Sequence, residues 1–394
     1  MGGKLGWYFA FYCLFQGLMS GLHVPYTSLT MYITNSQKER DSITAYRMVS
    51  EGIGVLLAAV VQGQLVDKTR KAGDCTNDNS TLSGQELDDQ KLAYMEGSII
   101  VIGIYMCCSI AVFFGVKERK GIVEDTKTSF FGGFKMVFTF RPYLLLSMSF
   151  LFLTFAVAII QGNLALFCTH TLKIGDMFSI IMIILLVTSI VTMPVWQIML
   201  NKFGKKTTYA AGMILFIPTQ MAQLYLPAGD PYSFFPLLFL GGISVSIALL
   251  LPWSMLPDVL DEFMIQKGTR KDALFYSFYV FFNKLATGLG IGVSQLALEF
   301  GGYQTGMCDQ PSSVALTLRL LVVPGPVVFL LIALVCLWKY PIDETRRQQI
   351  RKEVEEKQRM RVGGLAEKGG MVLKDPDILQ SVSYKTISTS STEM

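Results

Sequence analysis

The chain has 394 residues, of which 51% are hydrophobic and only 16% are charged, and its mean hydropathy is +0.44. Soluble domains carry about 25% charged residues, so this composition is typical of an integral membrane protein. A formal net charge of only +4 argues against a nucleic-acid partner. The two histidines and seven cysteines show no metal-ligand spacing. No nucleophile–base pair stands out either, so we expect no metal centre and no enzyme.

The charged residues lie in short stretches between long apolar runs. A bilayer core of about 30 Å is crossed by a helix of about 20 apolar residues. The pattern therefore predicts nine transmembrane helices, at Leu5–Met31, Ile43–Val66, Ala93–Val116, Tyr143–Cys168, Phe178–Met199, Thr208–Leu226, Phe234–Leu256, Ala273–Leu298 and Val314–Tyr340. The first run is too long for a cleavable signal peptide.

Lysine and arginine gather in alternate loops, which indicates the orientation of the chain. They follow the first, third, fifth, seventh and ninth predicted helices, and the positive-inside rule makes those loops cytoplasmic. The C-terminal tail is then cytoplasmic as well. The loop Asp67–Leu92 is an exception, because it holds four basic residues but falls on the outer side.

Two features of the predicted outer loops indicate processing in an oxidising compartment. Asn79-Ser80-Thr81 is an N-glycosylation sequon in a long polar loop. Cys75 in the same loop and Cys308 in Gly301–Ser313 are favoured as a disulfide pair. The alternative is two free thiols.

Two basic side chains are expected at membrane depth, where a charge costs at least ~2.5–3.5 kcal/mol. Arg47 and Glu51 share a helix face at positions i and i+4. They form either an ion pair that reaches the interface or a clamp for a substrate anion that Glu51 orients. Lys284 lies near the centre of the eighth helix with no partner adjacent in sequence. It is predicted to bind phosphate or to exchange partners during transport.

Prolines and carboxylates mark the end of the seventh predicted helix. Pro252 and Pro257 predict a helix broken twice, with Trp253 between them. Trp253 is either an interfacial anchor or a ring that stacks on a quaternary ammonium. Asp258 and Asp261 follow the predicted helix end and are interpreted as capping or gating groups on the cytoplasmic face.

The domain organisation follows from these elements. Residues 1–120 form a partial N-terminal group of three helices, 121–141 a cytoplasmic connection, 142–341 a six-helix half and 342–394 a cytoplasmic tail. The tail is predicted to begin as a basic helix at the anionic inner leaflet. After about residue 361 its composition predicts disorder.

Several blocks along the chain together resemble a known family. They are Phe11–Phe15, His23–Thr27, Glu39–Ser42, Thr44–Met48, Gln62–Gln64, Leu166–Thr169, Phe203–Lys206, Leu250–Val259, Tyr279–Phe282, Gly302–Thr305 and Tyr340–Glu344. The chain resembles the major facilitator superfamily domain-containing protein 2 group. That group contains sodium-dependent lysophosphatidylcholine symporters and sphingosine-1-phosphate exporters.

The resemblance implies an all-α membrane protein with the helical bundle of the major facilitator superfamily. The nine predicted helices match helices 4–12 of twelve. By position, Arg47 and Lys284 match headgroup-phosphate residues, and Cys75 and Cys308 match an extracellular disulfide. Ser20 matches a hydroxyl that helps at the sodium site, whose main carboxylates are expected on helices that the chain does not contain. Gln161 stands where the lysophosphatidylcholine carriers have a glutamate.

The resemblance therefore predicts a secondary-active transporter of lysophosphatidylcholine-type lipids, coupled to sodium in its full-length form. The substrate-binding residues are expected to be Arg47, Glu51, Gln161, Trp253 and Lys284. The expected partners are the lipid substrate and membrane lipids, around a monomer in the plasma membrane or endoplasmic reticulum. The alternatives are a sphingosine-1-phosphate exporter, a truncated non-transporting membrane protein and a sugar:cation symporter.

Overall fold

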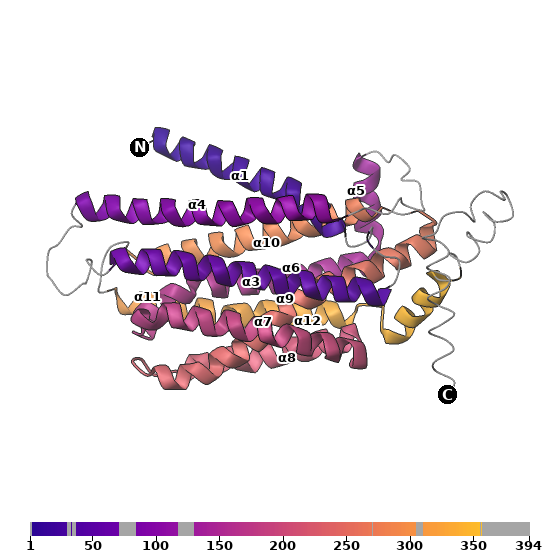
Figure 1. Cartoon of the computed structure of the whole chain (residues 1–394). Coiled ribbons are helices and arrows are strands. Elements are labelled where there is room, and N and C mark those ends of the chain that lie inside the picture. Colours follow the sequence, from indigo (N-terminus) through magenta and orange to yellow (C-terminus); the bar gives the residue numbers. More distant parts are fainter. Residues whose placement is uncertain are drawn as a thin grey trace, which may run out of the picture.

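The computed structural model describes residues 2–29, 33, 37–70, 84–116, 130–269, 271–304, 310–354 and 356. Within these ranges the chain forms helices and no strands. Its long helices run side by side as one bundle (Figure 1). The elements are α1 (Gly2–Ser28), α3 (Gln37–Arg70), α4 (Gly84–Gly115), α5 (Phe130–Thr139), α6 (Arg141–Leu166), the π-helical turn η1 (Phe167–Thr171), the 3-10 turn η2 (Gly175–Met177), α7 (Phe178–Phe203), α8 (Lys205–Ala222), the 3-10 turn η3 (Gln223–Tyr225), α9 (Pro231–Lys267), α10 (Asp272–Phe300), α11 (Ser312–Val322) and α12 (Pro324–Trp338).

Each predicted span coincides with helical structure. Six segments are long and apolar enough to cross a membrane: Glu39–Val61, Lys91–Gly115, Arg141–Thr171, Phe178–Phe203, Pro231–Lys267 and Ser312–Trp338. The other three predicted spans correspond to α1, α8 and α10, which carry more polar side chains. Membrane-spanning helices thus dominate the described part of the chain, as the sequence predicted.

The ninth predicted span is interrupted. The segment consists of α11 and α12, which meet at Val323 with φ −109° and ψ −80°. Pro324 follows directly, and a proline ring restricts the residue before it and supplies no N–H to the preceding helix. The predicted span over Val314–Tyr340 is therefore confirmed as one membrane-crossing segment, Ser312–Trp338, with a break at Val323 that the sequence analysis did not predict.

The prediction of a doubly broken seventh helix is also wrong. α9 continues for 37 residues through Pro252 and Pro257. Side chains from neighbouring helices donate to backbone carbonyls between the two prolines. The Tyr279 hydroxyl donates to the Pro252 carbonyl at 3.0 Å, and Lys205 Nζ donates to the Ser254 carbonyl at 2.7 Å. The carbonyls that the prolines leave without an N–H donor are those of Ala248 and Trp253, so these bonds do not replace the lost ones but hold α9 to α8 and α10, and packing in the bundle keeps the helix continuous.

The core lies mainly among α6, α8, α9, α10 and α12. Tyr143, Tyr209 and Tyr279 are fully buried there. Gly212 of α8 packs so closely on α9 that a Cβ atom at this position would overlap Ile247. Such small residues let helices approach each other closely where lipid provides no hydrophobic driving force.

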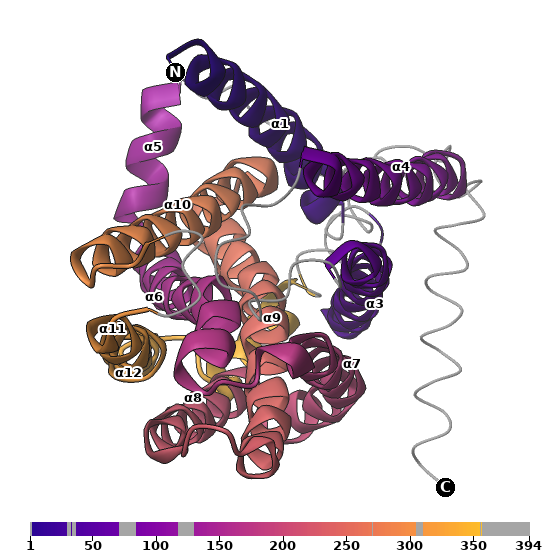
Figure 2. The ribbon, with the colours of Figure 1, turned by 90° about the vertical axis from the view of Figure 1, so that its left-hand side faces the viewer.

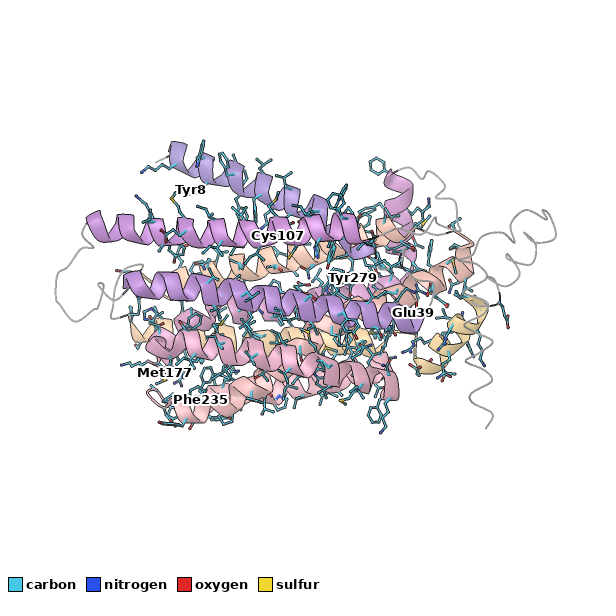
Figure 3. All side chains as sticks on the ribbon, viewed as in Figure 1. Tyr8, Glu39, Cys107, Met177, Phe235 and Tyr279 are labelled. Atoms are coloured by element: carbon cyan, nitrogen blue, oxygen red, sulfur yellow. The ribbon has the colours of Figure 1, made fainter. Side chains whose placement is uncertain are left out.

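Two of the N-terminal helices, α1 and α3, pack against the helices that form this core. α3 packs against α7 and α9, and α1 packs against α10. Viewed nearly along the bundle, α1, α3 and α4 lie on one side of the helices α6–α12 (Figure 2). Figure 3 shows Tyr279 well inside the bundle and Glu39 near one end of it. The candidate site lies where α1 and α3 face α9 and α10.

Candidate functional site

Arg47 of α3 lies where three helices meet. Its Nη1 atom donates to the carbonyl of Thr27 on α1 at 3.4 Å. Its Cζ atom lies 5.2 Å from the centroid of the Trp253 ring on α9 and 6.0 Å from that of Tyr26 on α1. These distances fall within the range of cation–π attraction. The guanidinium is therefore held between aromatic rings rather than extended to a helix end.

Glu51 makes no direct contact with the Arg47 guanidinium, so its role in orienting Arg47 stays a prediction. The two residues are one turn apart on α3, but among the described residues no ion pair joins them, and Glu51 is exposed. Both sequence interpretations of this pair assumed a direct contact. The partners of Arg47 come from α1 and α9, which the i, i+4 spacing does not reveal.

Trp253 lies in the interior, with 7% of its surface exposed, so it is not an interfacial anchor. Its ring centroid lies 5.3 Å from that of Tyr279, 5.7 Å from that of Phe150 and 5.8 Å from that of His23. The cation that its ring faces is Arg47. Stacking of Trp253 on a substrate ammonium stays a prediction.

Lys284 of α10 points toward α1. Its Nζ donates to Oε1 of Gln16 at 3.2 Å, and Nε2 of Gln16 donates to the Tyr12 hydroxyl at 3.2 Å. Both predicted cations thus donate hydrogen bonds to α1, Arg47 from α3 to the Thr27 carbonyl and Lys284 from α10 to Gln16.

The other predicted site residues are not joined to this group. Gln161 is exposed on α6 and forms no hydrogen bond within the described ranges. The Ser20 hydroxyl donates to the Gln16 carbonyl at 2.8 Å. Cys75, Cys308 and Asn79 lie outside the described residues, so the disulfide and the glycosylation site stay predictions. In the part of the chain that the structure describes, no group of three His, Cys, Asp or Glu side chains could hold a metal ion.

A second group of charges was not predicted as a unit. We call Arg40, Asp41, Lys205, Asp258 and Asp261 the charged cluster. Arg40 of α3 donates to both oxygens of Asp261, at 2.8 and 3.4 Å. Lys205 of α8 lies 2.5 Å from Asp41 and 2.9 Å from Asp258. All five side chains are buried.

The charged cluster ties α3 to α8 and α9 at one end of the bundle. By position in the sequence, Arg40 and Lys205 belong to the basic loops after the first and fifth predicted helices, and nothing there predicts that they are buried. The predicted boundaries placed Asp258 and Asp261 after a helix end, whereas both lie inside α9. A signal did exist in the sequence, since Asp258 and Asp261 share one helix face at i and i+3. Both aspartates pair with cations of other helices, and their predicted role in gating stays a prediction.

The beginning of the tail packs beside the charged cluster. Residues 344–354 are helical, and Ile350 and Val354 of this helix are buried in the core. Arg346 lies 2.9 Å from Glu262 of α9. The apolar side of this helix thus contacts protein, and its position at the inner leaflet stays a prediction.

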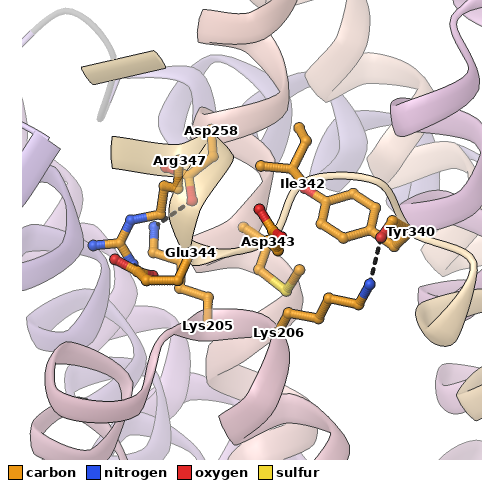
Figure 4. A pocket seen from close by; sticks show the side chains of 9 residues that line it. Lys205, Lys206, Asp258, Tyr340, Ile342, Asp343, Glu344 and Arg347 are labelled. Carbon is orange, nitrogen blue, oxygen red and sulfur yellow. Dashed lines mark hydrogen bonds and ion pairs between the residues drawn. The ribbon is translucent and has the colours of Figure 1, made fainter. Parts of the chain in front are cut away.

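A small pocket separates this tail helix from α8 and α9. Figure 4 shows Arg347 and Glu344 on one side of it and Lys205, paired with Asp258, beside them. Lys206 donates to the Tyr340 carbonyl at 2.6 Å. Opposite charges balance each other around this pocket, so it has no excess charge that would attract an ion.

Known proteins resemble this chain over most of its length. Residues 1–344 match the family described as MFS/sugar transport protein. A relative from Danio rerio, sodium-dependent lysophosphatidylcholine symporter 1-B, is 41% identical over 90% of this chain and 71% of its own length. A relative from Xenopus tropicalis, sphingosine-1-phosphate transporter MFSD2B, is 39% identical over 88% of this chain and 70% of its own.

Among solved structures, a bacterial homologue of the iron transporter ferroportin in an outward-facing state matches with a TM-score of 0.45. It shares 12% identity and covers 84% of this chain and 89% of that one. No argument rests on a likeness of this size. Three findings indicate a membrane transporter: the family match, the identity and coverage of the relatives, and the apolar helices. The chain belongs to the MFS/sugar transport protein family of multi-pass membrane transporters.

Proposed function

We propose that this chain moves lysophospholipids of the lysophosphatidylcholine type across a membrane as a secondary-active transporter. One observation carries the proposal. Arg47 and Lys284 both donate hydrogen bonds to α1 at the junction of apolar helices, where a cation without an anionic ligand is costly. Relatives named for lysophosphatidylcholine and sphingosine-1-phosphate transport support it. Both named substrates carry a phosphate and a long apolar chain.

The substrate's two parts need different surroundings. At ~0.8 kcal/mol per methylene, an 18-carbon tail exposed to water would cost on the order of 14 kcal/mol. The tail must therefore stay in lipid or against apolar helices, and only the headgroup enters the polar site. The guanidinium of Arg47 has the planar donor geometry that suits a phosphate. Lys284 supplies a second positive charge.

The charged cluster suggests how access alternates. It joins α3 to α8 and α9 at the end of the bundle that the basic loops assign to the cytoplasm. With that end closed, the headgroup site is reached from the opposite side. Separation of these pairs lets α3 move away from α8 and α9 and opens the cytoplasmic side, as expected when two groups of helices rock about a central site.

We further propose that transport is coupled to sodium, as the names of the lysophosphatidylcholine relatives indicate for those proteins. Ser20 is the candidate that this chain contributes to an ion site. We place the protein as a monomer in the plasma membrane with a cytoplasmic C-terminus.

Replacing Lys284 with alanine tests the headgroup site. In cells that display the variant at their surface, uptake of lysophosphatidylcholine should be abolished. The matched control is Lys339→Ala, which should leave uptake unchanged because Lys339 is exposed at the end of α12. Normal uptake by the Lys284 variant would remove this residue from the site.

Sphingosine-1-phosphate is the second candidate substrate. The neutral Gln161 favours it, because the family resemblance implies a glutamate at this position in the lysophosphatidylcholine carriers. Uptake and export of the two lipids should be compared with and without sodium. If neither lipid moves in protein that reaches the surface, the proposed lipid transport is wrong, and the alternatives are a non-transporting membrane protein and a sugar:cation symporter.

A further inference from the structure

The two cations of the headgroup site are held in different ways. Arg47 has three contacts, with a carbonyl and two aromatic rings from α1 and α9. Lys284 is exposed and donates one hydrogen bond, to the neutral amide of Gln16. No carboxylate pairs with Lys284 among the residues that the structure describes. Arg47 is thus fixed in place, whereas Lys284 can readily change partners.

The bond between Gln16 and Lys284 also connects two helices far apart in sequence. Gln16 lies on α1 and Lys284 on α10, 268 positions later. Tyr12 accepts from the other end of the same amide, which fixes the direction in which Gln16 Oε1 points. The three groups form a polar link across the contact between α1 and α10.

We propose that Gln16 is the resting partner of Lys284 and that the headgroup phosphate replaces it, which releases α1 from α10. The inference rests on the proposed function and names a positioning residue for that site. The ammonium makes a charge-assisted bond with either acceptor, but a phosphate oxygen carries a negative charge and the amide oxygen of Gln16 does not, so the phosphate attracts the ammonium more strongly. The phosphate can therefore displace an amide oxygen that accepts at 3.2 Å.

Because of this exchange, the contact between α1 and α10 depends on which lipid occupies the site. A lipid without an anionic group leaves the ammonium on Gln16, and the two helices stay joined. A lysophospholipid takes the ammonium away, and the link breaks. A ligand shifts such an equilibrium only by its difference in affinity for the two arrangements. The discrimination here is between lipids with and without a phosphate.

Two substitutions of Gln16 separate the possibilities in a cell uptake assay. Gln16→Glu gives Lys284 a charged partner that phosphate must displace, so uptake of lysophosphatidylcholine should fall roughly tenfold. Gln16→Leu removes the competitor, so the apparent KM should fall roughly fivefold. A role in packing alone would impair both variants in the same direction. Surface labelling corrects each rate for the amount of protein displayed.

Cross-linking between the native Cys13 of α1 and a cysteine introduced in α10 measures the contact between these two helices. Cys13 lies about one turn before Gln16 on α1, and Gly288 lies one turn after Lys284 on α10. The two helices run in opposite directions, so both positions are displaced toward the same end of the bundle (Figure 1). Both positions are open, since Cys13 is exposed and nothing lies within 4 Å of a Cβ atom at Gly288. A bifunctional maleimide should join Cys13 to Gly288→Cys, and mass spectrometry of the linked peptides gives the yield.

Lysophosphatidylcholine should lower the cross-linking yield, whereas a monoacylglycerol with the same acyl chain should not. In the Gln16→Glu background the yield should stay high with either lipid. Unchanged yield with lysophosphatidylcholine, or normal kinetics in both Gln16 variants, would overturn the inference. If Lys284→Ala abolishes uptake while the Gln16 variants are normal, only this inference fails. If the unmodified chain takes up no lysophosphatidylcholine, the proposed function fails as well.

Discussion

Replacing Lys205 with methionine should open the end of the bundle that the charged cluster closes. The ammonium of Lys205 lies between Asp41 and Asp258 and also donates to the Ser254 carbonyl. Methionine keeps most of the apolar stem but leaves two buried carboxylates facing each other. Breaking a buried ion pair typically costs about 3–5 kcal/mol. At tenfold for every ~1.4 kcal/mol, the closed arrangement should lose roughly a hundredfold to a few thousandfold in population relative to the open one.

Alkylation of a cysteine at Thr44 measures this opening. Thr44 is 2% exposed and lies one turn after Arg40 on α3, on the side that faces the charged cluster. Thr44→Cys should react slowly in the parent protein and much faster when Lys205→Met is added. The neighbouring Lys206 provides a matched control, because it donates only to carbonyls at the end of α12. Lys206→Met should leave the rate near that of the parent.

Removal of the two carboxylates tests the cause of the effect. Adding Asp41→Asn and Asp258→Asn to Lys205→Met should restore thermal stability in detergent, because uncharged buried groups carry no unpaired-charge penalty. The reasoning is refuted if Lys205→Met unfolds at the parent temperature and leaves the Thr44 cysteine as slow to react as before.

Two further predictions concern the headgroup site and the core. Trp253→Ala removes a ring that contacts Arg47, and cation–π contacts are worth ~0.5–2 kcal/mol, so the transport rate should fall roughly twofold to thirtyfold. Trp253→Phe keeps an aromatic ring and should retain part of the transport rate. An unchanged rate in Trp253→Ala would contradict this role. Gly212→Ala should lower the unfolding temperature measured by tryptophan fluorescence, because its methyl group would overlap Ile247, whereas Gly241→Ala should not, since no atom lies within 4 Å of a Cβ atom there.

The sequence predicted the positions of the helices well, because long apolar runs separated by charges are a strong local signal. The errors came from contacts between helices. Pro252 and Pro257 are local signals for a break, yet packing in the bundle keeps α9 continuous, with Tyr279 and Lys205 donating to the carbonyls between them. Nothing near the prolines in sequence indicates those partners.

The candidate site was predicted in part for the same reason. Arg47 and Lys284 were recognisable, since a basic residue within an apolar run needs an explanation. Their partners were not recognisable, because Gln16 and Trp253 lie on other helices. Glu51 was chosen by its i, i+4 spacing, but that spacing records proximity along a helix and not the direction that a long side chain takes. Arg40 and Lys205 were read as loop charges because burial cannot be read from residue type.

The unbroken α9 has a mechanical consequence. At 1.5 Å per residue its 37 residues form a rod about 55 Å long. Trp253 and Asp261 lie on this rod about 12 Å apart. A tilt of the rod that shifts the ring against Arg47 therefore also swings the carboxylate that grips Arg40. Movement at the headgroup site and opening of the charged cluster are then coupled through α9, because both sites lie on the same rigid helix.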